Sequence, residues 1–155
     1  MILQRIKVSS LYVTILYVIN RSIGRVDEEC ANSISMASAS GVTDLDVYIF
    51  PCISSSAYSL SHNISCPSAE GQVNDVLSYL IKNNIRIKHT NKIFESNQHS
   101  QKVTIGRFWI DIEDEVPSQY FDSDSKVNEL FLSDLTTALQ KHLIPFGWPI
   151  IIFSN

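Results

Sequence analysis

Several features are missing from this 155-residue sequence, and each absence excludes a class of function. No stretch stays apolar over the about 18 residues that a membrane-spanning helix needs, so we expect a soluble protein with no membrane partner. Lysine and arginine are scattered and the formal net charge is -4, which argues against nucleic acid as a partner. There is no P-loop, dinucleotide fingerprint or G-x-S-x-G elbow, so no cofactor is expected.

Cysteine is scarce, and the three cysteines are too far apart for a zinc site, which needs close pairs. If they are oxidised, a bridge between Cys52 and Cys66 fits best, because it would close the serine-rich segment 54–65 at its base. Asn20-Arg21-Ser22 and Asn63-Ile64-Ser65 match the N-glycosylation pattern. Together these features favour secretion. The four histidines pair with no nucleophile or metal, and we expect them to be solvated.

Apolar runs and helical spacing alternate along the chain. Three stretches have helical spacing: one after Asp27 that ends at Gly41, one from Ser68 to Asn83-Asn84, and one from Ser125 to His142 with Val127, Leu130, Phe131, Leu135, Leu139 and Leu143 on one face. The short apolar runs predict strands at Leu11–Ile19, Leu45–Phe50, Gly106–Ile112 and Ile150–Phe153. This alternation predicts one α/β domain over residues 1–155 with a parallel sheet.

Three segments are harder to assign. The run up to Ile19 follows Arg5 and Lys7, so it fits a signal peptide as well as a buried strand, although no small-residue cleavage site follows it. Residues 54–65 and 88–102 are polar with little periodicity, and we expect them to be loop insertions.

Trp109-Ile110-Asp111-Ile112-Glu113-Asp114 is the segment with the clearest chemical potential. In a strand, Trp109, Asp111 and Glu113 share one face. Two acids at the carboxyl end of a strand are typical of glycosidases, in which one carboxyl donates a proton and the other stabilises positive charge on the sugar. The alternative is that these acids only begin a polar loop.

The preceding strand also carries polar residues on one face, Asp46 and Tyr48, together with Phe50. An aspartate inside a buried strand needs a partner or a function. From the residues alone, the preferred interpretation is that Asp46 hydrogen-bonds to the backbone of the next strand.

Four blocks in a fixed order carry a resemblance to one family: Gly24–Cys30 (GRVDEEC), Asp46–Cys52 (DVYIFPC), Gly71-Gln72-Val73 and Trp109–Glu113 (WIDIE). From about Tyr12 to Ser154 the sequence resembles the glycoside hydrolase family 25, or Chalaropsis-type, lysozymes of invertebrates and protozoa. The resemblance implies a β/α barrel that cleaves the β-1,4 linkage between N-acetylmuramic acid and N-acetylglucosamine in bacterial peptidoglycan. It also implies a secreted or lysosomal protein, and we expect a monomer without a metal.

The resemblance assigns roles to single residues. Glu113 matches the general acid, and Asp111 matches the carboxylate that steadies the 2-acetamido group of the substrate. Asp46 and Tyr48 match the strand that lines the sugar cleft, and Trp109, on the same face as the two acids, is expected to bind substrate with them.

The chain departs from the family at both ends. Family members open with a strand that carries another active-site aspartate, and here no acidic residue precedes Tyr12. A barrel needs at least about 200 residues. We therefore expect a partial barrel without its first and last strands, with Tyr12–Ile19 as the second strand, and much slower lysis of bacterial walls than by a complete relative. The alternatives are an inactive lysozyme-like protein that at most binds glycan, and an α/β domain with a structural role.

Overall fold

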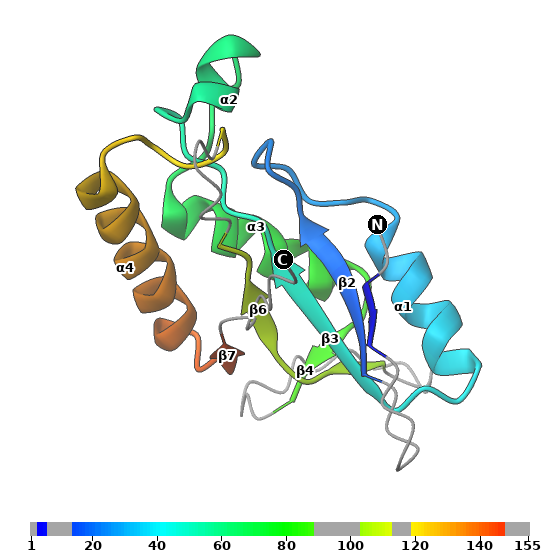
Figure 1. Cartoon of the computed structure of the whole chain (residues 1–155). Coiled ribbons are helices and arrows are strands. Elements are labelled where there is room, and N and C mark those ends of the chain that lie inside the picture. The colour runs from blue at the N-terminus through cyan, green and yellow to red at the C-terminus, as the bar shows by residue number, and fades with distance from the viewer. Residues whose placement is uncertain (1–2, 6–13, 89–102, 113–118, 148–155) are drawn as a thin grey trace.

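The computed structural model describes residues 3–5, 14–88, 103–112 and 119–147 (Figure 1). Helices and strands alternate along most of this part of the chain. In chain order the elements are β1 (Leu3–Arg5), β2 (Thr14–Asn20), α1 (Cys30–Ala39), β3 (Asp44–Ile49), α2 (Ala57–Ser61), α3 (Ala69–Lys82), β4 (Arg86–Ile87), β5 (Thr104–Ile105), β6 (Phe108–Ile110), α4 (Ser125–Lys141) and β7 (Phe146–Gly147).

The main sheet has the strand order β1-β2-β3-β6-β7. Strands β2, β3, β6 and β7 are parallel neighbours, whereas β1 pairs antiparallel with β2. A helix lies between each parallel strand and the next along the chain, and β4 and β5 form a separate two-stranded parallel sheet. The prediction of an α/β domain with a parallel sheet is therefore confirmed. Successive parallel neighbours joined by helices are also the arrangement within one arc of a β/α barrel. The described strands form an open sheet.

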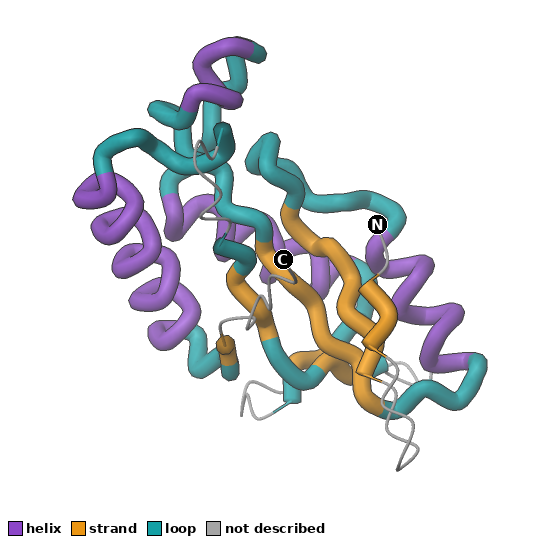
Figure 2. Tube along the Cα trace, in the orientation of Figure 1, coloured by secondary structure: helices purple, strands orange, loops and turns teal. Residues whose placement is uncertain are grey.

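The helices and one face of the sheet enclose the core. On β3 the side chains of Leu45, Val47 and Ile49 are buried in the core, and Phe108 and Ile110 of β6 join them. Figures 1 and 2 show α3 behind the sheet, with α1 and α4 to either side. These helices contribute Ile34, Val73, Val76, Leu80, Leu135, Ala138 and Leu139 to the same core. Because side chains alternate along a strand, Asp46 and Tyr48 lie on the opposite face of β3.

The structure corrects two details of the predicted elements. Leu130 and Leu143 were expected on the buried face of the last helix, but they are 59% and 62% exposed. Leu130 is exposed because α4 buries a narrower stripe of Leu135, Ala138 and Leu139, and Leu143 lies beyond the end of α4, where its φ of 56° turns the chain. The predicted strand Gly106–Ile112 is β6, which spans only Phe108–Ile110, and Gly106-Arg107 separates it from β5. Strand β2 supports the strand interpretation of the apolar run up to Ile19. Ile150–Phe153, residues 89–102 and residues 11–13 lie outside the described residues.

The segment 54–65, expected to be an exposed loop, contains the short helix α2. The hydroxyl of Ser56 accepts a hydrogen bond from the Ser59 backbone N–H at 3.2 Å, which caps the amino end of this helix. Ser56 and Ser59 are each only 1% exposed. A serine-rich composition therefore indicated a loop here, whereas two of these serines have a capping or buried role.

The expected bridge between Cys52 and Cys66 is present, with the two Cα atoms 5.5 Å apart, and Cys30 is a buried free thiol.

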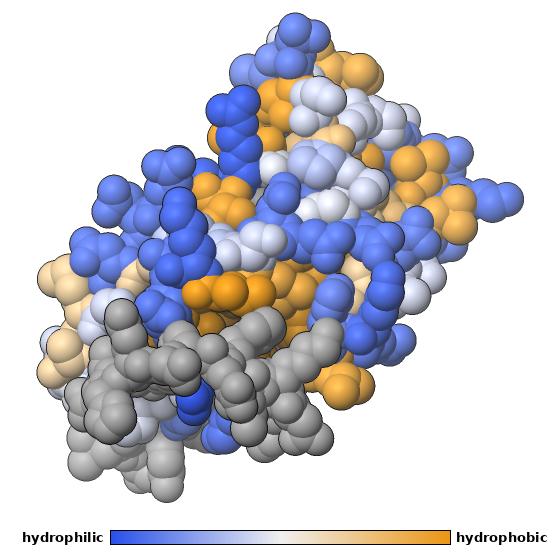
Figure 3. All heavy atoms as spheres, turned by 180° about the vertical axis from the view of Figure 1, so that it is seen from behind, coloured by the Kyte–Doolittle hydropathy of each residue, from blue (hydrophilic) through white to orange (hydrophobic). Residues whose placement is uncertain are grey.

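Within the described ranges, no helix is long and apolar enough to cross a membrane. From behind, Figure 3 shows polar side chains around an apolar band. The large apolar side chains that are most exposed, Met36, Leu60, Ile81, Leu130 and Leu143, are distributed over different elements.

Candidate active site

The candidate site lies where β3 and β6 end. These strands are parallel, and Ile49 of β3 pairs with Ile110 of β6. The next residue, Asp111, donates its backbone N–H to the Ile49 carbonyl at 3.0 Å. Asp111 therefore stands at the carboxyl end of β6, next to the position at which β3 continues into Phe50. This end of the parallel strands is where β/α enzymes place their catalytic groups.

Asp111 is partly buried, and burial raises the pKa of its carboxyl group above the ordinary value. A carboxyl group with a raised pKa at the carboxyl end of a strand is a functional-site candidate, because its charged form is poorly solvated there. Glu113, the expected general acid, lies outside the described residues. That it shares a cleft with Asp111 stays a prediction.

Asp46 uses both carboxylate oxygens within the protein. Its Oδ1 accepts a hydrogen bond from the Arg107 backbone N–H, and its Oδ2 accepts one from Trp109 Nε1, each at 2.8 Å. The side chain is only 9% exposed. The interpretation preferred from the residues alone, that Asp46 bonds the backbone of the next strand, is confirmed. The indole contact is an addition that the sequence did not predict.

Trp109 is held from several sides. It pairs with Tyr48 of β3 and with Gly147 of β7 in the sheet register. A Cβ atom at Gly147 would lie 3.1 Å from Trp109 Cζ3, so the absence of a side chain there leaves room for the indole. The Arg107 guanidinium lies 6.0 Å from the centre of the ring. Because its Nε1 reaches Asp46, the indole extends toward the amino ends of the strands, away from Asp111.

A group of aromatic residues near the same end of the sheet was not predicted as part of a site. Phe50 contacts Tyr120 with ring centroids 5.1 Å apart, and Tyr120 contacts Tyr58 at 4.7 Å. His62 is exposed, as expected, but its ring also lies against the Tyr58 ring, with the centroids 4.3 Å apart, which was not predicted. We call Phe50, Tyr58, His62 and Tyr120 the aromatic cluster. Tyr58 and His62 are four residues apart at α2, but Phe50 and Tyr120 come from other segments, so no spacing pattern marks the cluster as a whole.

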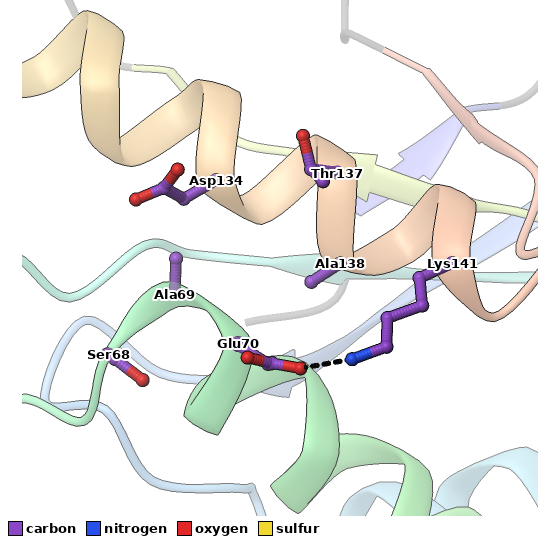
Figure 4. A pocket seen from close by; sticks show the side chains of 7 residues that line it. All are labelled: Ser68, Ala69, Glu70, Asp134, Thr137, Ala138 and Lys141. Atoms are coloured by element: carbon purple, nitrogen blue, oxygen red, sulfur yellow. Dashed lines mark hydrogen bonds and ion pairs between the residues drawn. The ribbon is translucent and has the colours of Figure 1, made fainter.

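A separate cavity of about 390 Å³ lies between α3 and α4 (Figure 4). Its polar rim includes the ion pair of Glu70 and Lys141, whose nitrogen and oxygen are 2.7 Å apart. The hydrogen bond from Lys141 lowers the pKa of Glu70. None of the predicted site residues lines this cavity. In the described ranges, no group of three or more histidine, cysteine or acidic side chains is placed to hold a metal ion.

A partly buried carboxyl group thus stands at the carboxyl end of a parallel strand, the end at which β/α barrels place their active sites. No protein-family model matches the sequence, and no solved structure matches it. It is 28% identical over 141 residues to the probable GH family 25 lysozyme 5 of Dictyostelium discoideum, which covers 86% of this chain. The chain spans about half, 51%, of the length of that relative. This similarity supports a distant relationship to the GH25 lysozymes.

Proposed function

We propose that the chain is a lysozyme-like glycoside hydrolase that acts on the β-1,4 linkage between N-acetylmuramic acid and N-acetylglucosamine. One observation carries the proposal: Asp111, a partly buried carboxyl group with a raised pKa, stands at the carboxyl end of β6, beside β3. The distant lysozyme relative supplies the substrate class.

Cleavage of a glycosidic bond needs a proton donor and a stabiliser of the positive charge that develops on the sugar. In the proposed mechanism, Glu113 donates its proton to the leaving glycosidic oxygen. The 2-acetamido oxygen of the substrate attacks the anomeric carbon, and Asp111 steadies this group as it becomes positively charged. Water then opens the cyclic intermediate and returns a proton to Glu113.

These roles require Glu113 to be protonated and Asp111 to be charged when the substrate is bound. A negative charge beside a carboxyl group raises the pKa of that group, so a charged Asp111 close to Glu113 would favour the protonated form of Glu113. A raised pKa keeps more of Glu113 protonated near neutral pH, which is what a general acid requires.

For the other predicted substrate-binding residues, we propose two different roles. Tyr48 is on the same face of the sheet as Asp111 and is proposed to line the sugar cleft. Asp46 has both oxygens engaged by Arg107 and Trp109, so we assign it to positioning Trp109 rather than to direct contact with sugar. The Cys52–Cys66 disulfide fits an oxidising compartment and supports secretion or a lysosomal location.

The test is the release of reducing ends from purified peptidoglycan by the wild-type chain, Glu113→Gln and Asp111→Asn. Loss of a general acid typically costs about 10²- to 10⁴-fold in rate, and we expect Glu113→Gln to fall by at least the lower figure. Asp114→Asn removes a carboxylate from the same acidic stretch but leaves the D-x-E block intact, so it is the matched control and should retain activity. Hydrolysis that survives Glu113→Gln would refute the assignment. Binding to peptidoglycan without hydrolysis would instead favour the glycan-binding alternative.

A further inference from the structure

The aromatic cluster has the chemical character of a sugar-binding surface. Tyr58, Tyr120 and Phe50 are each partly exposed and His62 is exposed, so part of this group of rings reaches the solvent. Flat rings present apolar faces to the C–H faces of a pyranose. The tyrosine hydroxyls add polar edges for sugar hydroxyls, as does Nε2 of His62, whose Nδ1 is held by the Ser61 hydroxyl and the Tyr58 carbonyl, each at 2.9 Å. Leu60, on the same helix as Tyr58, is also exposed, but its side chain is aliphatic and offers neither a ring face nor a polar edge.

The cluster is built from segments that the fold holds in place. Tyr58 donates its backbone N–H to the Gln119 carbonyl at 2.6 Å, which joins α2 to the segment before α4. A side-chain hydrogen bond from Ser55 to Asp122 makes a second link between these segments, and it helps to lower the pKa of Asp122.

The base of the α2 segment is also fixed. The Cys52–Cys66 disulfide closes it, and the buried Ser59 hydroxyl lies 3.4 Å from Cys66 Sγ. Gln72 of α3 accepts a hydrogen bond from the Cys52 backbone N–H and donates one to the Cys52 carbonyl, at 3.1 and 2.8 Å. A surface held in this way loses little conformational freedom when a ligand binds.

The cluster begins beside the candidate active site. Ile49 pairs with Ile110, so the same register places Phe50 next to Asp111. From Phe50 the ring contacts run through Tyr120 to Tyr58 and His62. In Figure 1 the arrowheads of β2 and β3 point toward the end of the molecule at which α2 stands. The row of rings therefore begins next to Asp111, at the carboxyl end of the sheet, and extends from there toward α2.

We propose that the aromatic cluster is an accessory binding surface for a polysaccharide, which holds sugar units of the glycan chain beyond those at Asp111. The inference rests on the proposed function, because it takes the ligand to be the glycan that Asp111 and Glu113 act on. Its role is to bind a long glycan chain, and it has no part in the bond-breaking step.

The experiment measures binding of the full chain to insoluble purified peptidoglycan by co-sedimentation, in a Glu113→Gln background so that the ligand stays intact. The variants Tyr58→Leu and His62→Ala each remove one ring, and Leu60→Ala is the control on α2. Each ring variant removes one stacking face, so we expect roughly three- to tenfold weaker binding for each of them and no change for Leu60→Ala. His62 is exposed, so its replacement should leave the fold intact even if Tyr58→Leu does not.

The outcomes separate this inference from the proposed function. Unchanged binding by both ring variants would overturn the accessory surface, while the activity of the chain with Glu113 restored would still decide the proposed function. Equal weakening by Leu60→Ala would also overturn it, because binding would then follow general apolarity rather than ring stacking. A Glu113→Gln chain with all its rings in place that does not sediment with peptidoglycan would overturn the accessory surface outright.

Discussion

Trp109 donates its indole N–H to the Asp46 carboxylate at 2.8 Å, which ties β6 to β3 through two side chains on the sheet face opposite the helices. The other Asp46 oxygen accepts the Arg107 N–H. A nearly buried carboxylate is costly unless its oxygens are hydrogen-bonded, and here both are. The pair therefore holds Trp109 in a fixed position below the candidate active site.

Replacing Asp46 should destabilise the fold. In Asp46→Asn, one of the two donors would face the amide NH₂ group and lose its acceptor. Hydrogen bonds to charged groups are worth about 1.5 to 3 kcal/mol each, so we expect a loss of roughly 2 to 4 kcal/mol in the free energy of unfolding. Urea unfolding followed by tryptophan fluorescence measures it. Asp44→Asn, at the more exposed start of β3, is the control, and an equal loss there would contradict the assignment.

Gly106→Ala should act through the same carboxylate. A Cβ atom at Gly106 would lie 2.6 Å from Asp46 Oδ1, so the carboxylate must move and its hydrogen bonds must weaken. We expect a loss of about 1 to 3 kcal/mol, in the range of other overpacked sites. In the Asp46→Ala background the substitution should cost much less, because the clashing oxygen is gone. Strictly additive losses in this double-mutant cycle would rule out the contact as the cause.

Strand alternation predicted which side chains share a face, because that pattern is local and has a period of two residues. It placed Asp46 with Tyr48 and Trp109 with Asp111. The hydrogen bond between Asp46 and Trp109 could not be predicted in the same way, because it depends on the register between strands 63 residues apart in sequence. The aromatic cluster was missed because Tyr120 lies far along the chain from Phe50 and Tyr58, the two rings that it contacts.

At α2 the local composition predicts a loop, whereas the structure has a short helix. Serine favours loops and turns, but Ser56 caps this helix and Ser59 is buried against the disulfide. The disulfide itself was predictable, because Cys52 and Cys66 are 14 residues apart and flank one segment. Strands of two residues, such as β4 and β7, are too short to leave a periodic pattern.

Removing the disulfide should destabilise the protein and loosen α2 first. Closing a loop of about 15 residues contributes about 3 kcal/mol in the chain-entropy model, and Cys52→Ser with Cys66→Ser should lose an amount of that order. Urea unfolding measures the loss, and hydrogen exchange should show faster exchange in residues 53–65 than in α3. Peptide mapping without reduction should recover Cys52 joined to Cys66. A main bridge that contains Cys30 would contradict the structure.

Cys30 should be unreactive in the folded protein. Burial, followed by the nearby charge of Asp27, raises the pKa of its thiol to about 12. Thiolate is the reactive form, so iodoacetamide at pH 8 should modify Cys30 only after unfolding. The unfolded chain releases this proton near pH 8.5 and the folded chain retains it, so stability should fall as pH rises from about 8.5 toward 12. Cys30→Ala should show a shallower fall, and an equal slope would contradict the burial argument.

Asp111→Asn should stabilise the folded chain at neutral pH. Burial raises the pKa of Asp111, so its contribution to stability is present below the unfolded pKa of about 3.9 and is lost as pH rises through the folded pKa. The amide carries no charge to desolvate, so the gain from the substitution should be clear at pH 7 and vanish near pH 3.

Hydrogen bonds from Ser55 and the Asp124 backbone lower the pKa of Asp122, so Asp122→Asn is a control of opposite sign and should destabilise at pH 7. Urea unfolding across this pH range measures both variants. If Asp111→Asn is more stable and also loses peptidoglycan hydrolysis, it shows the trade-off expected of a functional carboxylate. If Asp111→Asn is instead less stable at pH 7, the charged form of Asp111 is needed to hold the fold, and the burial argument is wrong.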